Sequence, residues 1–297
     1  MSVEATPWTD EGRDDLSLGT RAQNADARRG RLVRGVMLAV VLLYVGTLLL
    51  APLGGIVYSA FKSGLGTVAR TFTQSDVLHA FFLTFLIMAI VVVVTSVFGV
   101  AVALVLVRDR FPGRRLLSAL VDLPLAVSPV IVGLMAVLLF GTGGWFEGFF
   151  AARGIQIMFA LPSMVLVTIF ISVPFVIREV VPVLQELGTE EEQAAWTLGA
   201  SRIQTFFRVT LPNIRWGLLY GIALSSARAV GEVGAVLIVS GAIQGKTETA
   251  TLYILRAFDQ RQDAQGYVVA LTLAAFSILL LLFIEVFKRR KTREAQL

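Results

Sequence analysis

Ionisable residues inside otherwise uncharged apolar stretches are the first candidates for chemistry in this chain. Arg228 and Glu232 stand four residues apart within one such stretch. A guanidinium offers several N–H donors in a fixed fork that suits an oxyanion, and a carboxylate four residues along a helix could pair with it. Two roles stay open: Arg228 contacts a passing anion, or the pair latches one transport state. The small residues expected to line a narrow passage beside them are Ser225, Ser226, Gly231 and Gly234.

No catalytic centre is expected. The other acids in or beside apolar stretches, Asp122, Glu179 and Glu285, have no accompanying serine and histidine set. The chain has one histidine and no cysteine, so neither a metal cluster nor thiol chemistry is predicted. Residues 240–247 approach the phosphate-binding pattern G-x-x-x-x-G-K-[ST], but a serine stands at the first glycine and an apolar stretch, not a strand, precedes them. We therefore expect no catalytic residue, no metal and no cofactor on this chain.

The composition places the chain in a lipid bilayer. Of its 297 residues, 56% are hydrophobic and 16% are charged, whereas ordinary soluble domains have about 45–50% and about 25%. The net charge is +5. The basic residues form short clusters between apolar runs, as in integral membrane proteins. This pattern argues against nucleic acid as a partner.

Six apolar stretches are each long enough for a helix to cross the hydrocarbon core, which needs about 20 residues. The alternating segments of a membrane β-barrel are absent from the sequence. The predicted fold class is an all-α integral membrane protein with six transmembrane helices over 35–288, between a disordered tail (1–34) and a basic tail (289–297). The stretches are 35–61, 77–107, 116–140, 154–177, 216–243 and 264–284.

The distribution of lysine and arginine predicts the orientation. Both tails and the loops at 108–115 and 178–215 together hold 19 of the 26 basic residues, and the remaining loops hold 6. Loops rich in lysine and arginine stay on the cytosolic side. Both termini and these two loops are therefore predicted to be cytosolic, and the loops near 62–76, 141–153 and 246–263 external.

The loop between the fourth and fifth stretches predicts two short helices joined by a tight turn. Thr189 followed by Glu192 predicts a capping box at the start of the first helix. Gly199 is expected to end that helix in a left-handed conformation. Ser201 and Gln204 predict a capping box for the second helix.

The whole loop spans residues 186–213. Its second helix is predicted to end at Pro212 and to carry one apolar face. Ile203, Phe206 and Phe207 recur at positions i, i+3 and i+4. A short helix must bury such a face. From the residues alone, two partners stay open: the ends of the chain's own membrane helices, or a groove on a soluble protein.

The same loop resembles the E-A-A loop of ABC-importer permeases, whose pattern is E-A-A, three residues, a glycine and a later L-P. The glutamate position holds a glutamine here, and Glu192 lies one residue earlier. The resemblance implies that the loop is the coupling helix that seats in an ATP-binding subunit. The residues at the motif positions are Gln193, Ala194, Ala195, Gly199, Leu211 and Pro212.

The resemblance extends over roughly residues 40–287 and is to the sulfate and molybdate group of permeases. Two positions depart from the usual pattern: Val233 replaces an aromatic residue, and Ala242 replaces a histidine or asparagine. The segments that resemble sulfate and thiosulfate permeases are 122–130, 141–146, 211–221, 227–236 and 239–247.

The resemblance implies a permease subunit of an ATP-driven ABC importer for sulfate or thiosulfate in the bacterial inner membrane. The expected partners are a second permease, two ATP-binding subunits that hydrolyse ATP, and an external solute-binding protein. One alternative is a molybdate or tungstate permease. Another is a proton-coupled secondary anion transporter that uses Glu232. Such a carrier usually has an inverted repeat, which this sequence lacks, and it would leave the loop at 186–213 without a role.

Overall fold

The computed structural model describes residues 33–294, with side chains as far as residue 283. Every regular element among these residues is a helix, which confirms the predicted all-α fold class. The chain divides into two units, Met1–Tyr58 and Ser59–Leu297, each described by itself. The predicted disordered tail lies outside the described residues except for positions 33 and 34, and the predicted basic tail begins inside a helix.

The described residues of the first unit, from Val33 to Tyr58, lie in one apolar helix that ends in the second unit. This helix runs over Val33–Lys62, is long and apolar enough to cross a membrane, and matches the first predicted span. It contains a π turn, η1 (Gly46–Leu50), and continues as α2 (Ala51–Lys62). Nearly all side chains from 33 to 50 are exposed. Its apolar surface is therefore available to lipid or to another protein.

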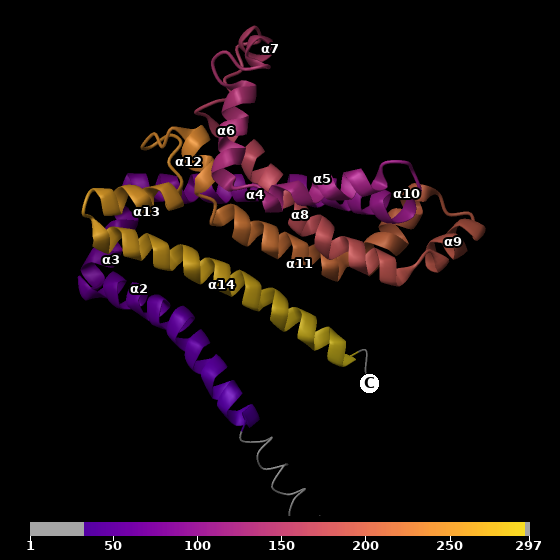
Figure 1. Ribbon diagram of the computed structural model, residues 1–297, viewed down its shortest axis with the longest axis horizontal. Helices are drawn as coiled ribbons and strands as arrows, with labels where there is room; N and C mark the ends of the chain where they lie inside the picture. The colour runs from indigo at the N-terminus through magenta and orange to yellow at the C-terminus, as the bar shows by residue number, and fades with distance from the viewer. Residues whose placement is uncertain (1–32, 295–297) are drawn as a thin grey trace, which may run out of the picture. The chain divides into compact units, whose positions relative to one another are not determined.

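Three long helices form the centre of the second unit. They are α4 (Ser75–Arg108), α8 (Leu161–Leu187) and α11 (Leu211–Val230), which pack against one another. A fourth, α14 (Asp263–Glu294), packs along α11 (Figure 1). The fourth predicted span began at residue 154, which is wrong because residues 154–160 are not helical. The helix starts at Leu161, where a proline in the first turn suits a helix start.

Two glycines let α11 approach α8 closely. A Cβ atom on Gly217 would lie 2.8 Å from the carbonyl oxygen of Glu179. One on Gly221 would lie 2.9 Å from the Cα atom of Val176. Side chains at these positions would push the helices apart, so the G-x-x-x-G spacing allows the close contact.

The third and fifth predicted spans are broken helices. α5 (Arg114–Ala126) and α6 (Pro129–Phe140) meet at 110°. A proline disfavours helical geometry in the residue before it, and Ser128, which precedes Pro129, has an extended backbone. α11 and α12 (Gly234–Ser240) meet at 54°. By length and composition, the described residues hold four candidate spans, or up to six if each bent pair counts as one.

Short helices lie at opposite ends of the second unit. At one end are α9 (Glu190–Thr197) and α10 (Arg202–Thr205), and at the other are α3 (Leu65–Thr73) and α13 (Ala250–Asp259) (Figure 1). A fifth short helix, α7 (Glu147–Ala151), follows α6. The loop around α9 and α10, predicted to be cytosolic, therefore lies at one end of the bundle. The loops around α3 and α13, predicted to be external, lie at the other end (Figure 1).

Candidate functional site

The turn at Gly199 has the geometry that the sequence predicts. Gly199 has φ +86°. Its N–H donates to the carbonyl oxygen of Trp196 at 3.0 Å, and the N–H of Ala200 donates to that of Ala195 at 3.0 Å. These two bonds form a Schellman motif, which ends α9 and satisfies its last carbonyl groups. No heavy atom lies within 4 Å of a would-be Cβ on Gly199, so the conformation and not the space requires glycine.

One of the two predicted capping boxes is present. The N–H of Gln204 donates to Ser201 Oγ at 3.3 Å, and the N–H of Ser201 donates to Gln204 Oε1 at 2.9 Å. The box predicted at Thr189 is wrong, because its side chain caps no N–H of α9. Thr189 Oγ1 instead accepts a hydrogen bond from Gln193 Nε2 at 3.0 Å. The carboxylate of Glu192 is engaged elsewhere.

Glu192 is held by a buried ion pair with Arg108, at the C-terminal end of α4. Arg108 Nε lies 3.0 Å from Glu192 Oε2, and Arg108 Nη2 lies 3.2 Å from Oε1. Thr210 Oγ1 donates to the same Oε1 at 2.8 Å. Arg108 Nη1 donates to the carbonyl oxygen of Leu184 at 3.2 Å, near the end of α8. This cluster, the Arg108–Glu192 clamp, ties α9 to two membrane helices.

The role of Arg108 could not be predicted from the sequence, in which this residue serves only as one of the charges that indicate orientation. The two clamp residues are 84 positions apart, and no local spacing predicts that they meet. One signal for this contact was the departure from the E-A-A motif, in which a glutamine stands at the glutamate position and Glu192 lies one residue earlier. Gln193, at the glutamate position, is exposed, whereas Glu192 is only 8% exposed.

The predicted apolar face of the second loop helix is divided in the structure. Ile203 and Phe207 are 72% and 61% exposed. Phe206 is half-buried and packs with Leu211 on the chain's own core around Ile214, which is the first of the two partners that the sequence left open. The cause is a π turn, η2 (Phe206–Thr210), which changes the helical period at Phe206.

Pro212 does not end the second loop helix. The helix runs on from Arg202 to Val230, so the loop continues directly into the fifth span. In the π turn the N–H of Leu211 bonds to the carbonyl oxygen of Phe206. The regular hydrogen-bond pattern of the helix is therefore already interrupted next to Pro212. A residue without an N–H can be accommodated at this position. Of the two alanines at the motif, Ala194 is exposed and Ala195 is half-buried.

The predicted pair of Arg228 and Glu232 is present, at a distance of 2.7 Å from Nη1 to Oε2. The reason given for it is wrong, because α11 ends at Val230 and Glu232 lies in the break before α12. Glu232 is 2% exposed. Its Oε1 accepts from the N–H of Ala235 and its carbonyl oxygen accepts from Thr251 Oγ1, both at 2.9 Å. Glu232 thus fixes both sides of the break.

The small residues near this pair lie in helix packing. Ser225 is fully buried and its Oγ lies 3.2 Å from Thr95 Oγ1 on α4. Ser226 Oγ donates to the carbonyl oxygen of Ile222 at 2.7 Å. Gly231 is exposed at the end of α11. A Cβ on Gly234 would lie 3.1 Å from the Cβ of Pro129, at the start of α6.

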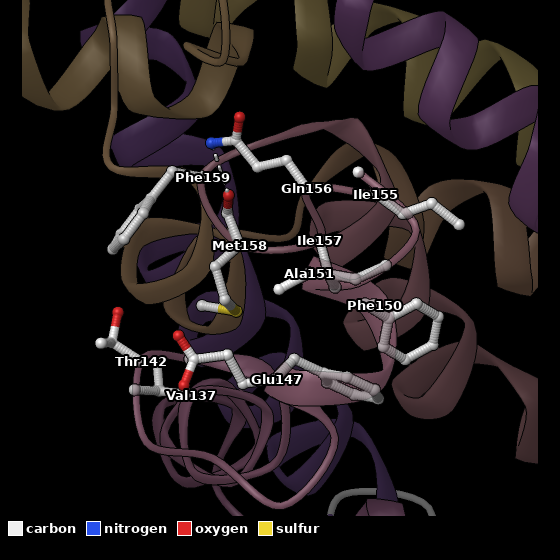
Figure 2. A pocket seen from close by; sticks show the side chains of 13 residues that line it. Val137, Thr142, Glu147, Phe150, Ala151, Ile155, Gln156, Ile157, Met158 and Phe159 are labelled. Carbon is white, nitrogen blue, oxygen red and sulfur yellow. Dashed lines mark hydrogen bonds between the residues drawn. The ribbon is translucent and has the colours of Figure 1, made fainter.

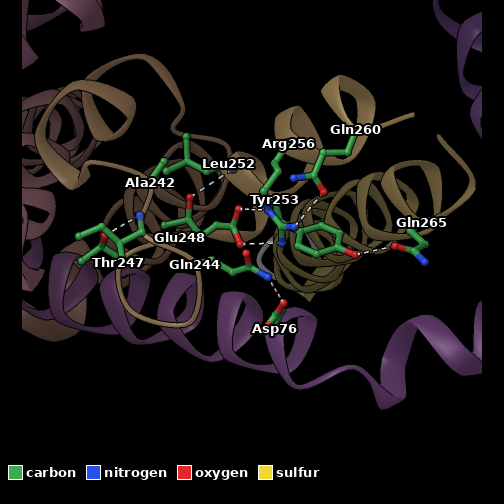
Figure 3. Close-up of polar contacts among 12 residues, drawn as sticks. Asp76, Ala242, Gln244, Thr247, Glu248, Leu252, Tyr253, Arg256, Gln260 and Gln265 are labelled. Carbon is green, nitrogen blue, oxygen red and sulfur yellow. Dashed lines mark hydrogen bonds and ion pairs between the residues drawn. The ribbon is translucent and has the colours of Figure 1, made fainter. Parts of the chain in front are cut away.

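A polar network holds α13 beside the break (Figure 3). Arg256 makes two contacts with the buried carboxylate of Glu248, Nε–Oε1 at 2.6 Å and Nη2–Oε2 at 3.0 Å. The hydrogen bond to Glu248 raises the pKa of Arg256 above its ordinary value. Tyr253 Oη lies 3.1 Å from Gln265 Oε1 and from Gln74 Oε1. Since Thr251 on α13 holds Glu232, the network also positions the break.

A pocket of about 570 Å³ lies between the end of α6, α7 and the segment before α8. Figure 2 shows Glu147 and Met158 facing each other across it, with Phe150 at one side. Gln156 Nε2 closes the segment by donating to the carbonyl oxygen of Met158 at 3.2 Å. The lining is mainly apolar, with Glu147 as its charged side chain.

Comparisons with known proteins agree with this geometry. Residues 95–293, about two thirds of the chain, match the family described as "Binding-protein-dependent transport system inner membrane component". The chain belongs to this family. The match begins within α4 and includes the loop with the clamp and both broken helices.

Two relatives show how far the similarity extends. The chain is 43% identical to the sulfate transport system permease protein CysW of Synechococcus elongatus over 261 residues, 88% of this chain and 91% of that one. It is 37% identical to the sulfate transport system permease protein CysT of Salmonella typhimurium, over 85% and 91% of the two chains. A bacterial ABC transporter involved in the import of alginate has the same fold, with a TM-score of 0.73, 18% identity, and coverage of 91% and 99%.

Proposed function

We propose that this chain is the transmembrane permease subunit of an ATP-driven ABC importer for sulfate or thiosulfate. The observation that carries the proposal is the 43–44% identity to CysW permeases over nearly the whole of both chains. We further propose a bacterial inner membrane location with cytosolic termini, supported by the charge bias of the loops. The relatives named CysT support a second permease as a partner.

The loop with α9 and α10 couples this subunit to an ATP-binding subunit. Its tip exposes large apolar side chains, namely Leu198 (88%), Ile203 and Phe207, between two membrane helices. An exposed apolar patch on a loop marks a protein contact. Two ATP-binding subunits hydrolyse ATP, and this chain binds no cofactor itself.

The Arg108–Glu192 clamp carries movement from the loop to the spans. A carboxylate that accepts from one guanidinium nitrogen and one hydroxyl, and lies in ion-pair contact with a second guanidinium nitrogen, is held in a fixed orientation. When an ATP-binding subunit moves α9, the clamp therefore obliges the ends of α4 and α8 to move with it. This gives the coupling loop a mechanical connection that does not depend on the backbone alone.

The Arg228–Glu232 pair acts as a latch on the broken fifth span. The guanidinium charge is balanced by the carboxylate of Glu232, which also accepts from the N–H of Ala235, while Thr251 holds the backbone carbonyl oxygen of Glu232. This pairing leaves little net charge to attract a dianion. Direct contact of Arg228 with the anion is the second role, favoured by its 28% exposed side chain. The two roles predict different effects on the apparent affinity for sulfate.

Reconstitution tests the function. The chain is incorporated into proteoliposomes with a second permease and two ATP-binding subunits, and radiolabelled sulfate is supplied with the solute-binding protein. We expect uptake that requires ATP and is inhibited by unlabelled sulfate or thiosulfate. Uptake driven by a proton gradient without ATP would instead identify a secondary transporter. Strong inhibition by molybdate alone would move the assignment to the molybdate alternative.

A further inference from the structure

A second cavity, with several polar side chains in its lining, lies between α5 and α8, away from the Arg228–Glu232 pair. Its volume is about 540 Å³. It is at the end of the bundle that carries the coupling loop, because α5 starts and α8 ends there, beside the Arg108–Glu192 clamp. The polar side chains in its lining are Arg114, Ser118, Asp122, Arg178, Glu179 and Gln185.

An ion pair crosses this cavity. Arg178 Nε on α8 donates to Asp122 Oδ1 on α5 at 2.9 Å. Arg178 stands nine residues before the end of α8 at Leu187, which places it about 13 Å along the helix axis. Charged side chains at such depth in a candidate span are costly, and they face a bundle interior or a water-filled cavity that serves as an ion path.

This pair differs from the other three ion pairs of the described residues in its exposure. The side chains of Arg178 and Asp122 are 57% and 43% exposed, whereas Glu192, Glu232 and Glu248 are 10%, 2% and 2% exposed. The contact with Asp122 uses one guanidinium nitrogen, Nε. An ion pair whose two side chains are this exposed is weak and can exchange partners, so it is poorly suited to hold two helices together.

We propose that this cavity is the release site for a tetrahedral oxyanion of the sulfate class, and that the anion displaces Asp122 from Arg178 as it passes. The proposal rests on the proposed function. A guanidinium offers a fork of donors to an oxyanion, and Ser118 and Gln185 add neutral donors in the same lining.

The charges of the cavity favour passage over retention. Arg114 and Arg178 are balanced by Asp122 and Glu179 in the lining. Conduction requires a site that binds strongly enough for entry and weakly enough for departure. Competition between the anion and Asp122 for one guanidinium supplies that balance.

Equilibrium binding of radiolabelled sulfate to the assembled importer, without solute-binding protein and nucleotide, tests the proposal. Asp122→Asn removes the competing charge and keeps the shape of the side chain. We expect it to raise sulfate binding by about fivefold, the factor that corresponds to an open ion pair, and to slow uptake. Arg178→Gln should abolish binding at this site. In the double variant the gain of Asp122→Asn should disappear.

The matched control is Glu186→Gln, which removes an exposed carboxylate from α8 outside the cavity lining. It should leave sulfate binding unchanged. Equal binding in Asp122→Asn and Glu186→Gln, or a gain in Asp122→Asn that persists without Arg178, would overturn the release site. Normal ATP-driven sulfate uptake by the wild type in that case would leave the proposed function intact. If a variant does not assemble, Asp122→Ser and Arg178→Met replace it, with the same expected directions.

Discussion

The coupling loop and the broken fifth span each hold a buried carboxylate paired with an arginine, but the two pairs join different things. Glu192 and Arg108 are distant in sequence and connect α9 with the ends of α4 and α8. Glu232 and Arg228 are four residues apart and hold the two halves of one broken helix. The first pair fixes the position of one element against others, and the second fixes the shape of a single element.

This difference predicts how each pair responds to substitution. Removing one partner of a buried pair leaves the other charge without compensation, which costs about 3–5 kcal/mol. At the loop, that cost falls on the connection between the coupling helix and the spans. At the break, it falls on the angle between α11 and α12 and on the contact with α13.

The largest expected effect is that of Glu192→Gln. The variant leaves the half-buried Arg108 without its counter-charge, so sulfate uptake in the reconstituted importer should fall at least about tenfold, the loss that corresponds to about 1.4 kcal/mol. ATP hydrolysis should continue without matching transport. The control is Glu190→Gln, which changes an exposed acid of the same helix and should transport normally. Equal uptake in the two variants would remove the clamp from the account.

Arg228→Met should also lower uptake severely, because it leaves the buried Glu232 uncompensated. Arg228→Lys keeps the charge and should retain part of the activity. If the pair is a latch, the maximal rate falls and the apparent KM for sulfate stays constant, whereas contact with the anion predicts a higher KM. A reversed pair is not a clean test, because an arginine at position 232 could not accept the N–H of Ala235. Normal uptake by Arg228→Met would contradict both roles.

Gly199→Asp is expected to have an intermediate effect. The residue has φ +86°, and a left-handed conformation costs a side chain about 1–2 kcal/mol. The Schellman turn should loosen, with less uptake and weaker copurification of the ATP-binding subunit. Asparagine tolerates this conformation better than other side chains, so Gly199→Asn should come closer to wild type. Similar uptake by Gly199→Asp and wild type would show that the turn is not critical for coupling.

The smallest effects separate the neighbours Phe206 and Phe207. Phe207→Ala removes an exposed side chain, so we expect weaker copurification of the ATP-binding subunit with an unchanged melting temperature. Phe206→Ala removes a side chain that packs on the chain's own core and should lower the melting temperature in detergent. The same loss of copurification in both variants, with no difference in melting temperature, would contradict the division of this face.

Features with a local cause could be predicted from the sequence. Hydrophobicity located all six apolar stretches, and glycine at position 199 predicted the left-handed helix end. The directions of the third and fifth spans could not be predicted in this way, because hydropathy measures composition and not direction. The break at Ser128 depends on a proline that other helices tolerate, as Pro174 within α8 shows.

Features that depend on tertiary contact were missed or misassigned. The capping box at Thr189 had the right residue types, but a stronger charged partner, Arg108, takes the carboxylate of Glu192. The face at Phe206 was assigned from a regular helical period, which a π turn interrupts. In the first case a local rule lost to a long-range ion pair, and in the second the regular period assumed for the helix is absent.

The central claim, that the loop end faces a cytosolic ATP-binding subunit and the α13 end faces outside, can be tested by labelling. The chain has no cysteine, so Ile203→Cys and Asp259→Cys each introduce one exposed thiol. A membrane-impermeant maleimide is applied to intact cells and to inverted vesicles, with and without the ATP-binding subunit. We predict that Ile203→Cys reacts only from the cytosolic side and is protected by the ATP-binding subunit, while Asp259→Cys reacts only from outside. Labelling of Asp259→Cys from the cytosolic side alone, or unprotected labelling of Ile203→Cys in the assembled importer, would contradict the account.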